Sequence, residues 1–308
     1  MPNSKPNRRA ILGSLAGGAA LPVLPTTGMG SSVVQNDDLG IRLGIITDPQ
    51  YADKPTSGSR RYREAAGKLE TAVAGINDAG VDLIVHLGDA IDGKENAETH
   101  LKRVFDIFAT SETPVVHLVG NHCLDGGKAL FDRASGMVAY YGAMRFNGWR
   151  FLLLDGNAIS IRGHEPQSPA HVEAAAIIKA GRVSWGGGLG KHQRSWLDDQ
   201  LKDAQGANER VLVLCHYPVD QSSNSENHLL WDYAEVSEIL EKFDCVKAWF
   251  CGHNHRGGYG CVNGIHHVTF QAICDAPQQS NAWAIAECLA NKIKIDGHGT
   301  VPSRDLDF

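Results

Sequence analysis

The chain has 308 residues, of which 43% are hydrophobic, 21% charged and 7% aromatic. This composition excludes an intrinsically disordered chain, and the length accommodates one large α/β domain or two small ones. The formal net charge is −6, so the chain lacks the basic field that draws proteins to nucleic acid, and we expect no nucleic-acid partner.

The N-terminal segment has the pattern of an export signal. Lys5, Arg8 and Arg9 precede a mildly apolar run over 10–24, and no acidic residue occurs before Asp37. The Arg8-Arg9 pair resembles a twin-arginine signal, which implies that bacterial export machinery carries the folded protein to the periplasm or the extracellular space. We expect residues 1–32 to be signal and linker, without a stable membrane anchor because the run is short; the alternative is a disordered extension. Residues 33–308 are expected to form a single domain.

Short apolar runs bounded by polar turns recur along the rest of the chain and predict buried strands. These runs cover residues 41–47, 81–87, 114–119, 149–154, 211–215, 246–251 and 266–272. Helical spacing of apolar residues predicts helices over 62–79 and 191–204. Strands that alternate with helices indicate an α/β fold with a largely buried sheet. Residues 157–190 are irregular and rich in Gly, Pro and His, which predicts an inserted loop over a substrate.

Polar side chains follow five of the predicted strands: Asp48, Asp89, Asn121, His216 and His253. In open α/β sheets the carboxyl ends of the strands form the ligand crevice, so we expect these side chains to meet at one edge of the sheet. Carboxylate, amide oxygen and imidazole are ligands for hard or borderline divalent metals.

The residues around these five positions extend the metal-binding pattern. The blocks are Thr47-Asp48-Pro49-Gln50, Gly88-Asp89, Gly120-Asn121-His122, Cys215-His216 and Gly252-His253-Asn254-His255. Side chains two residues apart on an extended segment point the same way, which pairs Asp48 with Gln50 and His253 with His255. The glycines before the ligands allow the backbone to turn tightly after each strand.

These five blocks, in this order, resemble the calcineurin-like metallophosphoesterase superfamily, whose pattern is D-x-H, G-D, G-N-H, H and G-H-x-H. The resemblance covers residues 48–255 and implies a β-sandwich flanked by helices, in α/β/β/α layers, with two divalent metal ions. It implies that Asp48, Gln50 and His255 bind one ion and that Asn121, His216 and His253 bind the other, with Asp89 bridging both. His122 would lie beside the scissile phosphate, as acid to the leaving group or as a stabiliser of charge.

Two positions depart from the superfamily pattern. Gln50 stands where most members have His, and its harder amide oxygen favours Mn²⁺ or Mg²⁺ over Zn²⁺ at that ion; Mn²⁺ is the first expectation, with Mg²⁺, Fe and Zn²⁺ as alternatives. Cys123 stands where many relatives have Glu or Asp after the G-N-H block. A carboxylate that orients His122 must then come from elsewhere, and we predict Asp92.

One branch of the superfamily is matched in more detail. The segment over 44–53, Gly88-Asp-Ala-Ile-Asp-Gly93, Trp185-Gly-Gly-Gly188 and the segment over 252–259 are similar to the manganese-dependent ADP-ribose/CDP-alcohol diphosphatases. The resemblance implies hydrolysis of a diphosphate within a small nucleotide conjugate. An Arg could pair with the second phosphate and a Tyr could stack on a base. The candidates for these contacts are Tyr51, Arg60, Arg61, Tyr62 and Arg63; alternatively they open a helix and face solvent.

Other functions compete with this interpretation. A cyclic-nucleotide or glycerophosphodiester phosphodiesterase of the same superfamily would use the same metal ligands. A metal-binding protein that has lost catalysis is a non-enzymatic alternative, although the presence of His122 argues against it. The chain has no G-x-S-x-G elbow and no G-x-G-x-x-G after its first strand. His86 alternates with apolar neighbours and is expected in the core.

Overall fold

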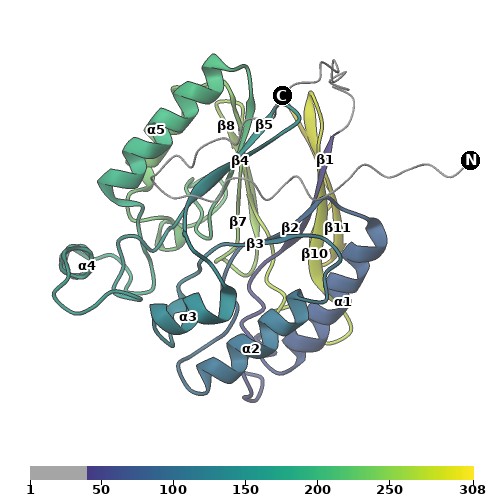
Figure 1. Ribbon diagram of the computed structural model, residues 1–308. Helices are drawn as coiled ribbons and strands as arrows, with labels where there is room; N and C mark the ends of the chain where they lie inside the picture. Colours follow the sequence, from purple (N-terminus) through teal and green to yellow (C-terminus); the bar gives the residue numbers. More distant parts are fainter. Residues whose placement is uncertain (1–39) are drawn as a thin grey trace, which may run out of the picture.

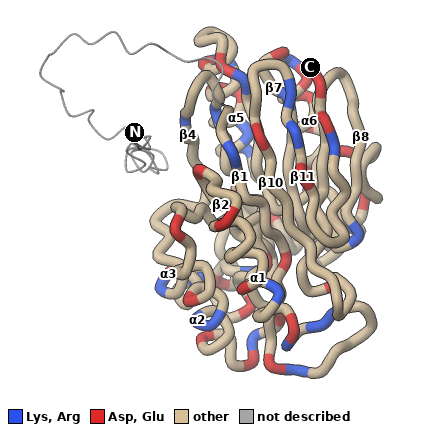
Figure 2. Tube along the Cα trace, turned by 90° about the vertical axis from the view of Figure 1, so that its right-hand side faces the viewer, with Lys and Arg blue, Asp and Glu red and all other residues tan. Residues whose placement is uncertain are grey.

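The computed structural model describes residues 40–308. The expected export signal and linker, residues 1–32, lie outside the described residues. Within the described part, no helix combines the length and the apolar character that crossing a membrane requires. In the view of Figure 2, Lys and Arg positions are interspersed with Asp and Glu positions along the chain.

The core of the fold is a pair of six-stranded mixed sheets (Figure 1). The first sheet has the order β12 (Arg304–Asp307), β11 (Lys292–Gly299), β10 (Ala282–Cys288), β1 (Ile41–Ile46), β2 (Leu83–His86) and β3 (Val115–His117). The second has the order β4 (Gly142–Phe146), β5 (Trp149–Leu153), β6 (Arg210–Leu214), β7 (Val246–Cys251), β9 (Ile265–Thr269) and β8 (Gly258–Val262). Strands β1 to β3 are parallel in the first sheet, and β5, β6, β7 and β9 are parallel in the second.

Helices cover the outer faces of the two sheets. The α-helices are α1 (Glu64–Ala79), α2 (Ala97–Phe108), α3 (Lys128–Ser135), α4 (Pro169–Lys179), α5 (Gly190–Gly206) and α6 (Tyr233–Leu240), and two 3₁₀ turns are η2 (His122–Leu124) and η3 (Glu226–His228). Helices α1, α2 and α3 pack on the first sheet, and α5 and α6 pack on the second. Helix α4 projects from the body of the molecule (Figure 1).

Three hydrophobic clusters hold the four layers together. On β1, Leu43 and Ile45 belong to the cluster between the sheets, whereas Ile46 belongs to the cluster under α1 and α2. Side chains alternate between the two faces of a strand, and here both faces are buried. This double burial explains why the central strands read as continuous apolar runs.

The structure confirms the α/β sandwich flanked by helices, and it contains a strand or helix at every position expected from the sequence. His86 is fully buried, as expected, and its Nδ1 lies 3.2 Å from Nδ1 of His117. The expectation of a single sheet edge was wrong. Asp48, Asp89 and Asn121 follow strands of the first sheet, and His216 and His253 follow strands of the second, so the site forms where the ends of two facing sheets meet.

Candidate metal centre

The backbone is bent sharply at four of the expected ligands. Asp48, Gln50, Asp89 and His253 have φ angles of 48°, 42°, 55° and 68°, in the left-handed region that non-glycine residues seldom adopt. Backbone hydrogen bonds hold this conformation, because the amide of Asp48 donates to the carbonyl of Gly88 (3.1 Å) and that of Gln50 donates to the carbonyl of Asp89 (2.9 Å). Such conformations cluster at functional sites, where the surrounding structure maintains the strain.

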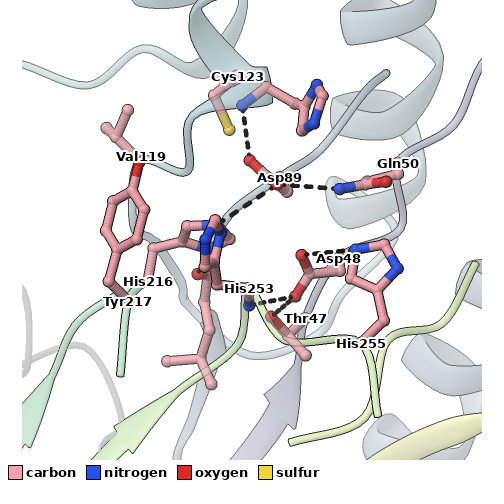
Figure 3. Close-up of polar contacts among 12 residues, drawn as sticks. Thr47, Asp48, Gln50, Asp89, Val119, Cys123, His216, Tyr217, His253 and His255 are labelled. Carbon is pink, nitrogen blue, oxygen red and sulfur yellow. Dashed lines mark hydrogen bonds and ion pairs between the residues drawn. The ribbon is translucent and has the colours of Figure 1, made fainter. Parts of the chain in front are cut away.

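The Asp89 carboxylate lies at the centre of the site (Figure 3). Its Oδ1 accepts a hydrogen bond from the backbone amide of His122 (2.8 Å), and its Oδ2 accepts one from Nε2 of Gln50 (2.9 Å). Nε2 of His216 lies 3.4 Å from the same Oδ2. One buried carboxylate therefore contacts segments from both sheets, which is the position that a bridging ligand requires.

Two histidines of the second sheet face each other beside Asp89. Nδ1 of His216 lies 2.8 Å from the carbonyl oxygen of Leu87 and donates to it, which leaves Nε2 directed at Nδ1 of His253, 3.1 Å away. Burial opposes protonation of both rings, yet the Asp89 carboxylate raises the pKa of His216 to about 9. Burial and the neighbouring His216 lower the pKa of His253 well below its usual range. Two imidazole nitrogens that face each other in this way can both bind one cation when the rings are neutral, the form that metal ligation requires.

Asp48 and His255 form the other half of the site. Oδ2 of Asp48 accepts hydrogen bonds from the Thr47 hydroxyl (2.6 Å) and the backbone amide of His253 (3.1 Å). Its Oδ1 lies 3.5 Å from Nε2 of His255, whose Nδ1 lies 3.2 Å from the Asp275 carboxylate. A carboxylate behind the ring is the usual way in which a metal-binding histidine is oriented.

The donor atoms fit a pair of divalent ions. Oδ1 of Asn121 is buried without a hydrogen-bond partner, although buried polar atoms are nearly always paired, and Oδ1 of Asp48 has only Nε2 of His255, 3.5 Å away, beside it. Asp89, His216 and His253 each present a ligand atom within 4.8 Å of the others. His255, Cys274 and Asp275 form a second such group, in which Sγ of Cys274 and the Asp275 carboxylate lie 3.6 Å and 3.2 Å from Nδ1 of His255.

The orienting role predicted for Asp92 was wrong. Nδ1 of His122 lies 2.8 Å from Oδ2 of Asp125, while Asp92 pairs with Lys54 and, at 3.0 Å, with Arg60. Asp125 follows His122 by three residues across the 3₁₀ turn η2, a spacing at which side chains eclipse. That spacing is visible in the sequence and could have identified Asp125.

The five predicted substrate contacts lie in different surroundings. Arg60 remains next to the site, held by Asp92. Tyr62 is 7% exposed and lies under the ammonium group of Lys54, so it offers no face to a base and that prediction was wrong. Arg63 is 58% exposed and pairs with Asp53 at the surface (2.6 Å), which agrees with the alternative that this side chain faces solvent.

Two of the candidates contact neighbouring protein groups. Tyr51 is half-buried, with its ring edge-on to His100 at 5.3 Å. Arg61 donates its backbone amide to the carbonyl of Cys274 (2.8 Å). Their substrate roles stay predictions.

Aromatic residues that the sequence did not single out as ligands surround His253. The rings of Tyr217 and Trp185 lie 4.4 Å and 5.2 Å from its ring, and His228 lies 5.3 Å from Trp185. The Tyr217 hydroxyl donates to Oδ1 of Asn157 (2.8 Å). Both Asn157 and Trp185 belong to the segment 157–190, so its two ends reach the metal centre.

Comparison with known proteins agrees with this geometry. A family model described as calcineurin-like phosphoesterase matches residues 41–257. A manganese-dependent ADP-ribose/CDP-alcohol diphosphatase from Oryza sativa subsp. japonica is 31% identical over 299 residues, covering 86% of this chain and 93% of that protein. The protein of the same name from Homo sapiens is 26% identical and covers 86% of this chain and 92% of its own length.

The fold also matches a solved structure. The crystal structure of a dimetal phosphatase from Danio rerio superposes with a TM-score of 0.81 at 26% identity, covering 88% of this chain and 100% of that one. These similarities confirm the predicted resemblance and the expectation of divalent metal ions, manganese first among them.

Gly252 offers a test of how tightly the ligands are packed. A Cβ atom there would collide with the Thr47 hydroxyl and the Asp48 carboxylate, so Gly252→Ala should displace Asp48 and lower Mn²⁺ affinity by about 10- to 100-fold, as loss of a supporting contact does in other metal sites. Calorimetric titration of metal-stripped protein with Mn²⁺ measures this. Gly67→Ala on α1, where a Cβ meets nothing within 4 Å, is the matched control. Unchanged Mn²⁺ affinity in Gly252→Ala would show that the close packing around Asp48 does not contribute to Mn²⁺ binding.

Proposed function

Since the chain belongs to the calcineurin-like phosphoesterase family, we propose that it hydrolyses the diphosphate of small nucleotide conjugates such as ADP-ribose and CDP-alcohols. The protein is a metal-dependent hydrolase. The names of its relatives give the substrate class, and the surroundings of the metal centre support that class for this chain.

The observation that carries the proposal is a pair of cations beside the metal centre. Lys54 and Arg60 both pair with Asp92, and their side chains are 39% and 38% exposed. The segment that carries Arg60 is fixed to the site, because the Ser59 hydroxyl donates to Asp275 (3.0 Å), the residue that orients His255. Exposed cations beside metal-bound phosphate suit a second phosphate, which a diphosphate has and a simple diester lacks.

An aromatic surface lies next to the other set of ligands. The half-buried Trp185 and His228 stand beside His253, whereas Arg60 stands near His255. Stacking of a base on an aromatic ring contributes about 1–3 kcal/mol. In a nucleoside diphosphate conjugate, the aromatic surface would bind the base, the metal site one phosphate and the two cations the second phosphate.

In the proposed reaction the residues of the chain have separate tasks. Asp48, Gln50 and His255 would hold one ion, Asn121, His216 and His253 the other, and Asp89 would lie between them. Two bound divalent ions supply polarisation of the phosphoryl oxygens. His122, oriented by Asp125, would give a proton to the leaving oxygen. The products are a nucleoside monophosphate and a phosphorylated alcohol or sugar.

A substrate panel tests the proposal. Metal-stripped protein refilled with Mn²⁺ should hydrolyse ADP-ribose and CDP-choline and act weakly on cyclic AMP and bis-p-nitrophenyl phosphate, with His253→Ala as the blank. Arg60→Met should raise KM for the two diphosphates about 10-fold, the effect of one lost charged hydrogen bond, and leave KM for the diester within about 3-fold. Arg63→Met is the matched control from the same segment.

The outcomes separate the family from the substrate class. Turnover restricted to bis-p-nitrophenyl phosphate would keep a phosphoesterase and contradict the diphosphatase. Preference for cyclic AMP would favour the cyclic-nucleotide alternative. Equal effects of Arg60→Met and Arg63→Met on KM would remove Arg60 from the substrate site.

We also propose that the protein is exported to the periplasm or beyond. Lys5, Arg8 and Arg9 before the apolar run over 10–24 support this. Replacing both Arg8 and Arg9 with Lys should retain the full-length chain in the cytoplasmic fraction of a bacterial host, whereas the wild type should appear shortened in the periplasmic fraction. Immunoblotting of the two fractions measures this, and equal distribution of the two proteins would contradict a twin-arginine signal.

A further inference from the structure

The Asp125 carboxylate joins three separate segments of the chain. Its Oδ2 lies 2.8 Å from Nδ1 of His122 and also accepts a hydrogen bond from the backbone amide of Gly93 (2.9 Å). Its Oδ1 pairs with Nη1 of Arg162. The Asp125 side chain is only 12% exposed, so these contacts form in a setting where water competes weakly for the carboxylate.

Arg162 belongs to the segment 157–190, and contacts of the neighbouring residues fix the backbone of that segment near Arg162. The Ser160 hydroxyl donates to the carbonyl of Arg162 (2.7 Å). Gly163 lies against Leu124, so closely that a Cβ would stand 2.7 Å from Cδ1 of that leucine. Ile159 and Gly188 exchange two backbone hydrogen bonds of 2.9 Å, which join the two ends of the segment. The guanidinium is therefore held against Asp125 by the backbone around it.

The geometry gives Arg162 a defined effect on His122. A hydrogen bond to the charged carboxylate from a guanidinium fixes both the plane and the charge of the carboxylate. A carboxylate fixed in this way holds Nδ1 of His122 and leaves Nε2 as the nitrogen that faces other groups. Asp92 instead pairs with Lys54 and Arg60.

We propose that Arg162 is a positioning residue for His122, acting through Asp125, so that proton donation to the leaving group depends on the docked segment 157–190. The inference rests on the proposed function for the role of His122. In the step concerned, a water oxygen bonds to phosphorus and gives its proton to solvent. The bond from phosphorus to the leaving oxygen breaks, and that oxygen takes the proton from Nε2 of His122.

Leaving groups of different acidity test the proposal. The substrates are the phenyl and the p-nitrophenyl ester of one nucleoside 5′-monophosphate, with Mn²⁺-loaded full-length protein. Phenolate needs a proton as it leaves and p-nitrophenolate needs it far less. Arg162→Met should lower kcat for the phenyl ester about 10- to 100-fold, part of what a general acid contributes, and change kcat for the p-nitrophenyl ester less than about 3-fold. Arg162→Lys, which keeps the charge, should recover part of the loss.

The controls distinguish positioning from a structural role. Arg182→Met removes another arginine of the same segment, one that pairs with Glu226 (2.8 Å), and should leave both rates unchanged. Equal losses on the two esters, or no loss on either, would overturn the proposal. Failure of the wild type on ADP-ribose and CDP-choline, with turnover of the esters, would contradict the diphosphatase and leave the result for Arg162 intact.

If neither ester is turned over, a spectroscopic measurement tests whether Arg162 positions His122. In Mg²⁺-loaded protein, the Nδ1 proton of His122 bound to Asp125 should give a downfield imidazole resonance. That resonance should be lost or shifted in Arg162→Met and kept in Arg182→Met. Its persistence in Arg162→Met would show that Asp125 holds the ring without Arg162.

Discussion

The structure depends on one buried carboxylate that two sheets share. Asp89 follows a strand of the first sheet, yet its oxygens contact Gln50, the backbone of His122 and His216 of the second sheet. A buried charge is costly unless it is paired and hydrogen-bonded, so these segments must converge wherever Asp89 lies. The left-handed backbone at Asp48, Gln50, Asp89 and His253 is the local consequence, since the strand ends turn inward at the same point.

Close packing makes this convergence possible. A Cβ at Gly120 would collide with the Asp89 carboxylate, and one at Gly252 with Asp48. The glycines that precede the ligands therefore serve the approach of one segment to another, in addition to the tight turns expected from the sequence. The same packing leaves Oδ1 of Asn121 buried without a hydrogen-bond partner, which is the state in which a divalent cation is a favourable partner.

The ligands could be predicted from the sequence because each follows a buried strand, and strand ends and ligand types are both local signals. The division of the strands between two sheets could not be predicted from the sequence. It depends on pairings between distant segments, such as that of β1 with β10, where Gly44 lies opposite Ile285. The partner of His122 was missed for a different reason. Asp125 lies three residues after His122, a spacing that could have identified it, whereas Asp92 lies in another part of the sequence, and only the folded chain shows that it pairs with Lys54 and Arg60 instead.

Diffraction at the manganese absorption edge tests most directly whether Asp89 lies between two metal ions. Crystals of the protein grown with Mn²⁺ should show two anomalous peaks, one on each side of the Asp89 carboxylate. One should lie next to Asp48 and His255, and the other next to His216 and His253. A single peak, or a peak confined to Cys274 and Asp275, would contradict the bridging role of Asp89 and the two-metal site built on it.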